Sequence, residues 1–257
     1  MREWNFIDFS GEDTIGLVWL NRPPVNAVNG AMYLEIKEFF DDVASHLPDA
    51  RVIVLGGRGK HFCGGNDLAE FQTMTPENAG QRMRLVREAF WAIYDCSVPV
   101  IAAVHGVAVG TGLAIAASCD LVVAAEGARF GLPEVNVGVM GGAKHLSRLV
   151  PQGVVRRLHL QGDLVPAEEL QRYGGICEIV PGDRLDATAR ELARSIARHS
   201  PAVLRFAKRS LNAIEYMPLK EGYEYEQGLT GELAAYDDSK EAVNAFLERR
   251  APVYTGH

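Results

Sequence analysis

The sequence predicts a mixed α/β fold that ends in a run of helices. Near its start, Thr14–Leu20 has the alternating pattern of a half-buried strand. In the middle, the β-branched run Val98–Val104 leads into a glycine-rich turn and then a stretch of small residues. Beyond Ala143, apolar residues recur mostly at helical spacing. A chain of 257 residues has room for one large domain or two small ones, and for a sizeable core.

The first third predicts two strands, a helix and a third strand. A strand around Phe6–Phe9 is followed by the turn Gly11–Asp13 and by the strand Thr14–Leu20. The prolines after Asn21 end that strand, because proline cannot donate to a sheet. Asn29 is a suitable N-cap for a helix, and Val52–Leu55 reads as a short buried strand.

The next segment predicts a polar loop and then an amphipathic helix. Thr73–Gly80 is rich in turn residues, and apolar residues recur at helical spacing over Leu85–Ile93. We expect this loop and helix to shape a ligand pocket. The opposite face of the helix is expected to be solvated, and it carries Arg82, Arg84 and Arg87.

The stretch from Pro99 to Ala143 organises the rest of the chain. A strand up to Val104 meets the turn Gly106–Gly112, a short helix Leu113–Ser118 and a strand at Leu121–Val123. Glycines let a backbone approach a ligand closely, and the N–H groups that begin a helix have no partner within it. Such a turn favours negative charge and can hold a developing oxyanion.

The remainder predicts helices with one short strand. We expect helices over Val154–Leu160 and Glu168–Tyr173, a strand at Cys177–Val180, and then three helical stretches. These are Ala187–His199, Ala202–Tyr216 and Ser239–Arg249. Periodicity by itself specifies no arrangement of these elements in space.

Composition excludes several classes of protein. A net charge of −7 argues against nucleic-acid binding, and no apolar run approaches the ~20 residues of a membrane helix. The start MREWNFIDF has no basic-then-apolar signal pattern, so we expect a cytoplasmic protein. The cysteines form no C-x-x-C and are expected to be buried free thiols, and the histidines lack metal-ligand spacing. Lys144 and His145 are interpreted as a surface basic pair.

Four groups of motifs along the chain together resemble those of a known protein family. They are LNRPPVNAV, HFCGGNDLAEF, the run IAAVHGVAVGTG with CDLVVAA and ARFGLPEVNVGV, and AFLERRAPVYTGH at the end. Jointly and in this order they resemble the crotonase superfamily, the enoyl-CoA hydratase/isomerase family. The resemblance implies a spiral of ββα units over residues 1–195, with the acyl-CoA site. It also implies a helical oligomerisation region over 196–257 and a homotrimer or a dimer of trimers.

The resemblance implies an oxyanion hole made of two backbone N–H groups. One would come from Thr111, where the family usually has glycine, on the turn with Gly110 and Gly112. The other would come from Asn66, a bulkier residue than usual in the small-Gly-small-Asp pattern. Two donors at a thioester oxygen polarise the carbonyl and stabilise an enolate.

The resemblance also implies where coenzyme A binds. Backbone around Val25–Ala27, including Val25 and Ala27, and around Cys63–Leu68 would hold the adenine end. The second segment comprises Cys63, Gly64, Gly65, Asn66, Asp67 and Leu68, and Asp67 would also cap a short helix. Arg249 matches a basic position that serves the coenzyme A phosphate of a neighbouring subunit.

Glu134 is the candidate acid–base residue. It follows Pro133 in a stretch with few charges, and desolvation would raise its pKa toward neutral pH. Hydratases of the family carry a second glutamate in a G-G-G-x-E pattern, where this chain has Ala114. The arrangement resembles that of the family's single-carboxylate isomerases.

We therefore expect an enzyme that performs enolate chemistry on an enoyl-CoA, without a metal or a redox cofactor. Other reactions of the family, C–C cleavage or thioester hydrolysis, stay open. So do a non-catalytic acyl-CoA-binding protein and a structural trimer without a ligand. Glu134 discriminates among these, because a pure binder has no use for it.

Overall fold

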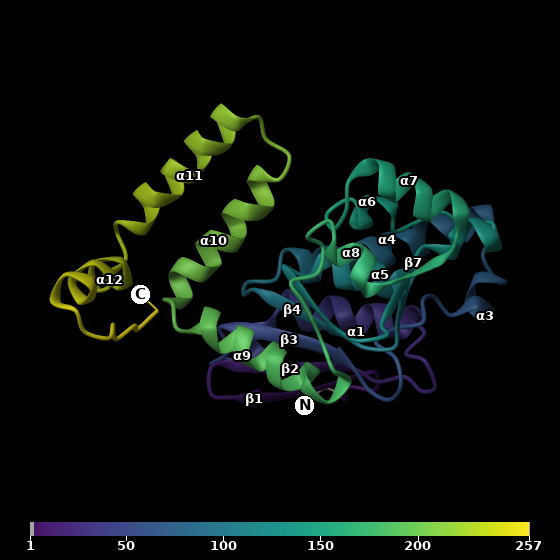
Figure 1. Cartoon of the computed structure of the whole chain (residues 1–257), viewed down its shortest axis with the longest axis horizontal. Helices are drawn as coiled ribbons and strands as arrows, with labels where there is room; N and C mark the ends of the chain where they lie inside the picture. The colour runs from purple at the N-terminus through teal and green to yellow at the C-terminus, as the bar shows by residue number, and fades with distance from the viewer. Residues whose placement is uncertain (1–2, 257) are drawn as a thin grey trace.

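The computed structural model describes residues 3–256 and contains two sheets (Figure 1). The larger sheet begins with an antiparallel hairpin, and every later pairing in it is parallel. Its strands, in spatial order, are β1 (Ile7–Glu12), β2 (Ile15–Leu20), β3 (Val52–Gly57), β4 (Val100–Val104), β6 (Leu121–Ala125) and β9 (Glu178–Val180). The turn of the hairpin is Asp13–Thr14, two residues later than expected, since Gly11 and Glu12 pair within the sheet.

A second, three-stranded sheet carries the glycine-rich segment. Its strands are β5 (Val107–Val109), β7 (Arg129–Gly131) and β8 (Leu164–Pro166). None of the three was predicted, and the turn expected over Gly106–Gly112 is wrong at Val107–Val109, which pairs with β7. A single β-bridge joins Cys63 to Ala108. This bridge brings the segment after β3 beside β5, and it positions the site described below.

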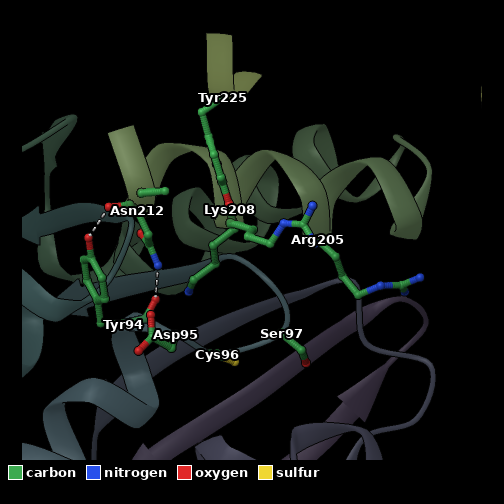
Figure 2. Close-up of a pocket in the computed structure, with 10 residues that line it drawn as sticks. Tyr94, Asp95, Cys96, Ser97, Arg205, Lys208, Asn212 and Tyr225 are labelled. Carbon is green, nitrogen blue, oxygen red and sulfur yellow. Dashed lines mark hydrogen bonds between the residues drawn. The ribbon is translucent and has the colours of Figure 1, made fainter. Parts of the chain in front are cut away.

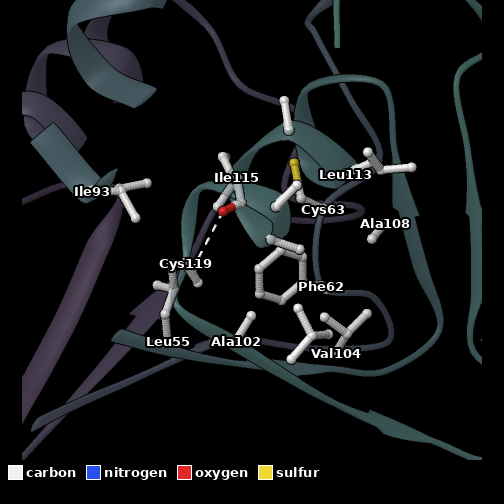
Figure 3. Packing of buried hydrophobic residues seen from close by; sticks show 14 of the residues in the cluster. Leu55, Phe62, Cys63, Ile93, Ala102, Val104, Ala108, Leu113, Ile115 and Cys119 are labelled. Carbon is white, nitrogen blue, oxygen red and sulfur yellow. Dashed lines mark hydrogen bonds between the residues drawn. The ribbon is translucent and has the colours of Figure 1, made fainter. Parts of the chain in front are cut away.

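Helices cover both faces of the larger sheet. One face packs against α1 (Gly30–Asp41), α4 (Pro76–Tyr94) and α5 (Thr111–Ser118). Figure 3 shows this core near α5, where Phe62 lies among Leu113, Ala102 and Val104. The other face packs against α9 (Leu185–Ala197), whose Ala189 and Ala193 share a cluster with Val54 of β3.

The remaining helices are short connectors or belong to the C-terminal part. The connectors are α2 (Val43–His46), α3 (Leu68–Phe71), η1 (Pro133–Val137), α6 (Ala143–Leu146), α7 (Gln152–Gln161), α8 (Ala167–Gln171) and η2 (Gly182–Arg184). The C-terminal helices are α10 (Pro201–Ile214), α11 (Leu219–Leu233) and α12 (Asp237–Glu248). Within residues 3–256, no helix is long and apolar enough to span a membrane.

Two helix predictions were wrong. The segment Thr73–Gly80 is not a loop throughout, because α4 begins at Pro76 and the N–H of Thr75 donates to Asn78 Oδ1 at 2.9 Å. Between Val180 and residue 256 the structure has four α-helices, not three, because α11 was missed. The segment of α11 contains three glycines, which disfavour a helix, and its apolar residues recur only weakly at helical spacing, so the sequence did not predict this helix.

A buried lysine fastens α10 to the sheet. Lys208 Nζ donates to the carbonyl groups of Ile93 and Val98, both at 3.2 Å, and to Asp120 Oδ2 at 2.8 Å. From that anchor, α10 and α11 extend away from the sheet, and α12 lies at the opposite end of the molecule from α3 (Figure 1). The division between residues 195 and 196 stays a prediction.

Candidate functional site

Two loops lie side by side where coenzyme A was expected to bind. The N–H of Gly64 donates to the carbonyl of Val25 at 2.8 Å, and the N–H of Val28 donates to that of Gly65 at 2.8 Å. The N–H of Asp67 then donates back to the carbonyl of Val28 at 2.9 Å. Although the two segments are distant in sequence, the fold therefore joins them into one backbone ladder.

The glycine-rich turn approaches this ladder closely. Gly110 has a φ of 55°, and a Cβ there would lie 3.1 Å from Glu134 Oε1. A Cβ on Gly112 would collide with the carbonyl of Cys63. A side chain at either position would meet a neighbouring group, so both positions require glycine. The close approach at Gly112 lets the start of α5 pack directly against the loop that contains Cys63 and Asn66.

Two backbone N–H groups in this region have no acceptor. Thr111 is the first residue of α5, where a helix leaves its N–H groups unpaired. Among residues 3–256, no hydrogen bond is formed by the N–H of Thr111 or by that of Asn66. Asn66 lines both cavities, whereas Thr111 is buried beside them.

Glu134 lies on η1 in a largely desolvated position. Glu134 is 7% exposed, and its Oε2 has no hydrogen-bond partner among the described residues. Burial raises the pKa of this carboxyl above its ordinary value. An unpaired carboxylate with a raised pKa is suited to proton transfer.

Two adjacent cavities meet at Asn66 and Phe71. The first, of about 180 Å³, brings Asn66 and Glu134 together; it is also lined by Gly64, Gly65, Leu68, Val109 and Gly110. The second, of about 120 Å³, is largely apolar and continues toward α4. Its apolar lining includes Met74, Met83, Leu85 and Val86, and its polar lining comprises Tyr33, Asn66, Asp67, Glu70 and Arg82. The helix that was expected to shape a pocket does line one.

Two sequence-predicted residues support the site: Cys63 from outside both cavities, and Asp67 from the wall of the apolar cavity. Cys63 is fully buried, and burial raises the pKa of its thiol to about 12. Asp67 Oδ1 accepts from the N–H of Ala69 and so caps α3, while its Oδ2 pairs with Arg22 at 2.6 Å. Neither cavity is lined by Val25, Ala27, Thr111, Gly112 or Ala114.

Ala114 and Arg249 are not at the cavities of this chain. Ala114 is fully buried within the core cluster. Arg249 ends α12, at the opposite end of the molecule from α3 (Figure 1). Contact between Arg249 and coenzyme A would need another copy of the chain, and it stays a prediction.

Sequence reasoning missed Tyr33. Its hydroxyl donates to Asn66 Oδ1 at 2.5 Å and lies 2.6 Å from Thr111 Oγ1. A tyrosine on an amphipathic helix gives no sign in the sequence that it will reach two distant loops. Only the packing of α1 against α4 and α5 brings these three residues together.

Two other expectations were wrong. His145 is not part of a surface basic pair: it packs edge-on against Phe90, and burial lowers its pKa to about 4. Cys177 is exposed, although the other three cysteines are buried and all four are free. Within residues 3–256, no cluster of three potential metal ligands occurs.

A separate cavity of about 450 Å³ lies between the end of α4 and α10 (Figure 2). Its polar groups are largely engaged: Lys208 pairs with Asp120, and Tyr94 donates to the carbonyl of Asn212 at 3.0 Å. It shares no lining residue with the two cavities at Asn66. We therefore assign the site to the cavities that contain Asn66 and Glu134.

Known proteins match this chain along nearly its whole length. The model of the enoyl-CoA hydratase/isomerase family matches residues 10–257. A (7aS)-7a-methyl-1,5-dioxo-2,3,5,6,7,7a-hexahydro-1H-indene-carboxyl-CoA hydrolase of Rhodococcus jostii is 39% identical over 93% of each chain. The 2,3-dehydroadipyl-CoA hydratase of Escherichia coli is 34% identical, over 96% of this chain and 97% of its own.

Solved structures agree with these matches. An enoyl-CoA hydratase from Bacillus anthracis superposes with a TM-score of 0.92 at 28% identity, covering 98% of this chain and 100% of its own. The fold is therefore the crotonase-like α/β fold that the motifs implied. With a family model matched from residue 10 onward and relatives above 30% identity over the same span, this chain belongs to the enoyl-CoA hydratase/isomerase family.

Proposed function

We propose that this protein is an enzyme that acts on acyl-CoA thioesters with Glu134 as its single acid–base group. The observation that supports this proposal is that Glu134, whose Oε2 is unpaired, lines the same cavity as Asn66. The N–H groups of Asn66 and Thr111 would bind the thioester oxygen. Each such donor is worth about 2.7–4 kcal/mol to the transition state in enzymes where it has been removed.

The chemistry proceeds through an enolate. Glu134 takes a proton from the carbon beside the thioester, and the C–H electron pair moves onto the thioester oxygen between the two N–H donors. Return of that proton to a different carbon shifts the double bond of an enoyl chain. One carboxylate completes this cycle, and no metal or redox cofactor is required.

These residues are less suited to hydrating an enoyl-CoA than to shifting its double bond. It needs a water held over the β-carbon as well as a proton for the α-carbon, and Ala114 offers no second carboxylate. Orientation of reacting groups contributes several kcal/mol to catalysis, so a single carboxylate should hydrate slowly. We therefore propose isomerisation or proton exchange as the better activity of this site.

Hydrolysis is the second candidate, and the names of two relatives favour it. A protein from Mycobacterium tuberculosis that is 38% identical bears the same CoA hydrolase name as the Rhodococcus relative. Glu134 could deprotonate a water molecule that attacks a carbonyl carbon, and this step needs only one base. Hydrolysis of the thioester bond or cleavage of a C–C bond next to a ketone would both follow that route.

We further propose that the acyl group carries oxygen beyond the thioester. Arg82 lines the apolar cavity and donates to the carbonyl of Glu70 and, at 3.0 Å, to Thr73 Oγ1. Arg82 forms no ion pair among the described residues. The two carboxylates that line the same cavity have other partners, because Asp67 pairs with Arg22 and Glu70 accepts from the N–H of Gly30. The charge of Arg82 would therefore face a polar acyl group. The names of the relatives specify dioxo-indene-carboxyl and dehydroadipyl thioesters.

One panel tests these proposals. Calorimetry compares each acyl-CoA with its free acid, and ¹H NMR in D₂O follows deuterium exchange beside the thioester. We expect binding of the thioesters only, exchange or isomerisation of 3-hexenoyl-CoA, and slow hydration of crotonyl-CoA. Equal affinity for acid and thioester would contradict the acyl-CoA site. Release of free CoA, or of a ring-opened product from a cyclic keto-acyl-CoA, would favour the hydrolase instead.

A further inference from the structure

The hydroxyl of Tyr33 connects three segments that are far apart in the sequence. It donates to Asn66 Oδ1 at 2.5 Å, and it lies 2.6 Å from Thr111 Oγ1. Tyr33 comes from α1, Asn66 from the loop after β3, and Thr111 from the first turn of α5. Both partners, Asn66 and Thr111, have backbone N–H groups that form no hydrogen bond within residues 3–256.

The surroundings keep this hydroxyl in place. Tyr33 is 3% exposed, and its ring meets Phe90 in a T-shaped contact with centroids 6.1 Å apart. Burial raises the pKa of its phenol, so the hydroxyl stays protonated at any physiological pH. The N-cap bond from the N–H of Met32 to Asn29 Oδ1, at 2.9 Å, fixes the turn that bears it.

We propose that Tyr33 is a positioning residue that sets the distance between the two oxyanion-hole donors. Its hydroxyl holds the side chains of Asn66 and Thr111 together, so their backbone N–H groups converge on one oxygen. The proposal rests on the proposed acyl-CoA function. It also gives a role to the side chains of Asn66 and Thr111, which supply the two oxygens that the hydroxyl of Tyr33 holds.

Tyr33→Phe is the direct test, because it removes only the hydroxyl. A donor pair that is misplaced by a fraction of an ångström should stabilise the enolate less while binding the substrate nearly as well. We expect kcat to fall by about 10-fold or more, with KM little changed. The ultraviolet absorbance of bound 2,4-hexadienoyl-CoA should also shift less to the red, because that shift reports polarisation of the conjugated carbonyl.

The two partners supply a second test that does not depend on Tyr33 itself. Thr111→Val and Asn66→Ala keep both backbone N–H groups and remove the side-chain oxygens. We expect each to reproduce part of the loss in kcat. In the Asn66→Ala/Thr111→Val background, Tyr33→Phe should cost almost nothing more, because the hydroxyl then has nothing to hold.

Tyr94→Phe is the matched control. Its hydroxyl also bonds a carbonyl and Glu215 Oε2, each at 3.0 Å, but it lies at the separate cavity. It should leave kcat and the spectral shift unchanged. Unaltered kcat and red shift in Tyr33→Phe, or in both partner variants, would overturn the positioning role. If the wild type bound no acyl-CoA at all, the proposed function would fail instead.

Discussion

At the scale of single residues, Glu134 combines three properties that suit proton transfer. It is buried, its Oε2 is unpaired among the described residues, and it faces the cavity that Asn66 lines. The close approach of Gly110 leaves no space for a side chain between that residue and the carboxylate. The desolvation that raises the pKa of Glu134 for catalysis should therefore also lower the stability of the folded protein when Glu134 is ionised.

Replacement of Glu134 by glutamine should separate these two effects. We expect Glu134→Gln to lower proton exchange by about 10²–10⁴-fold, the usual contribution of general acid–base catalysis, while acyl-CoA still binds. Because burial raises the folded-state pKa, ionised Glu134 disfavours folding at neutral pH. The Tm of the variant at pH 7 should thus equal or exceed that of the wild type, and the difference should vanish in acid, where both are neutral.

The wild-type pH profile provides an independent check of Glu134. If its carboxylate is the base, activity is lost as pH falls through its pKa. That loss should occur at a higher pH than the ordinary glutamate value of 4.5. An acid limb at or below 4.5, or a glutamine variant with most of its turnover, would remove Glu134 from the mechanism.

Ala114 is a residue whose neighbourhood is already filled. Its side chain is fully buried and lines neither cavity. We expect Ala114→Glu to lower the Tm, because a new carboxylate there would be buried without a partner. Crotonyl-CoA hydration, measured beside thermal unfolding, is expected to stay low. A variant with unchanged Tm and faster hydration would mean that the site has room for a second acid.

At the scale of elements, one ion pair joins the C-terminal helices to the sheet. Lys208 is 3% exposed, and its ammonium satisfies two backbone carbonyl groups as well as Asp120. Asp120 also accepts from the N–H of Val100 at 2.7 Å, so the pair spans α10, β4 and the start of β6. Lys208 therefore helps to orient α10, together with the hydrogen bonds between Tyr94 and Asn212.

Loss of Lys208 should be costly. Lys208→Met leaves the Asp120 carboxylate without its cation and two carbonyl groups without a donor. We expect a loss of roughly 3 kcal/mol in the free energy of unfolding, measured by urea denaturation. Lys240→Met is the control, since Lys240 and its partner Asp237 are both largely exposed, and it should change stability very little. Similar losses in the two variants would contradict the anchor.

At the scale of the whole molecule, the C-terminal helices expose large apolar side chains. Phe246 of α12 is 82% exposed and Leu219 of α11 is 88% exposed; Leu211, Tyr223, Val243 and Leu247 are exposed as well. Such side chains on adjoining helices indicate a surface that another subunit covers. We propose that copies of the chain assemble through this region.

Light scattering tests that assembly. We expect a mass of three or six times 28.1 kDa at micromolar concentration. Phe246→Glu places a charge in the proposed interface and should shift the mass toward the monomer. A wild type that is monomeric at these concentrations would contradict the proposal, and would leave Arg249 without access to coenzyme A.

The sequence by itself determined the strands of the larger sheet, but not β5, β7 and β8, and it named candidate residues for the site. Local signals are sufficient there: β-branched runs form β4 and β6, Asn29 caps α1, and Asp67 caps α3. It failed at α11, where glycines conceal a helix that packing stabilises; a Cβ on Gly222 would touch Ile214 of α10. Family motifs, rather than periodicity, supplied the acid–base role of Glu134.

Only the tertiary structure decided which side chains meet. Tyr33 reaches Asn66 and Thr111 because the packing of α1, α4 and α5 brings together residues up to 78 positions apart. His145 is half-buried against Phe90, and Lys208 is buried against Asp120, for the same reason. Hydropathy and spacing describe one segment at a time, whereas burial and hydrogen bonding depend on what the fold places opposite each residue.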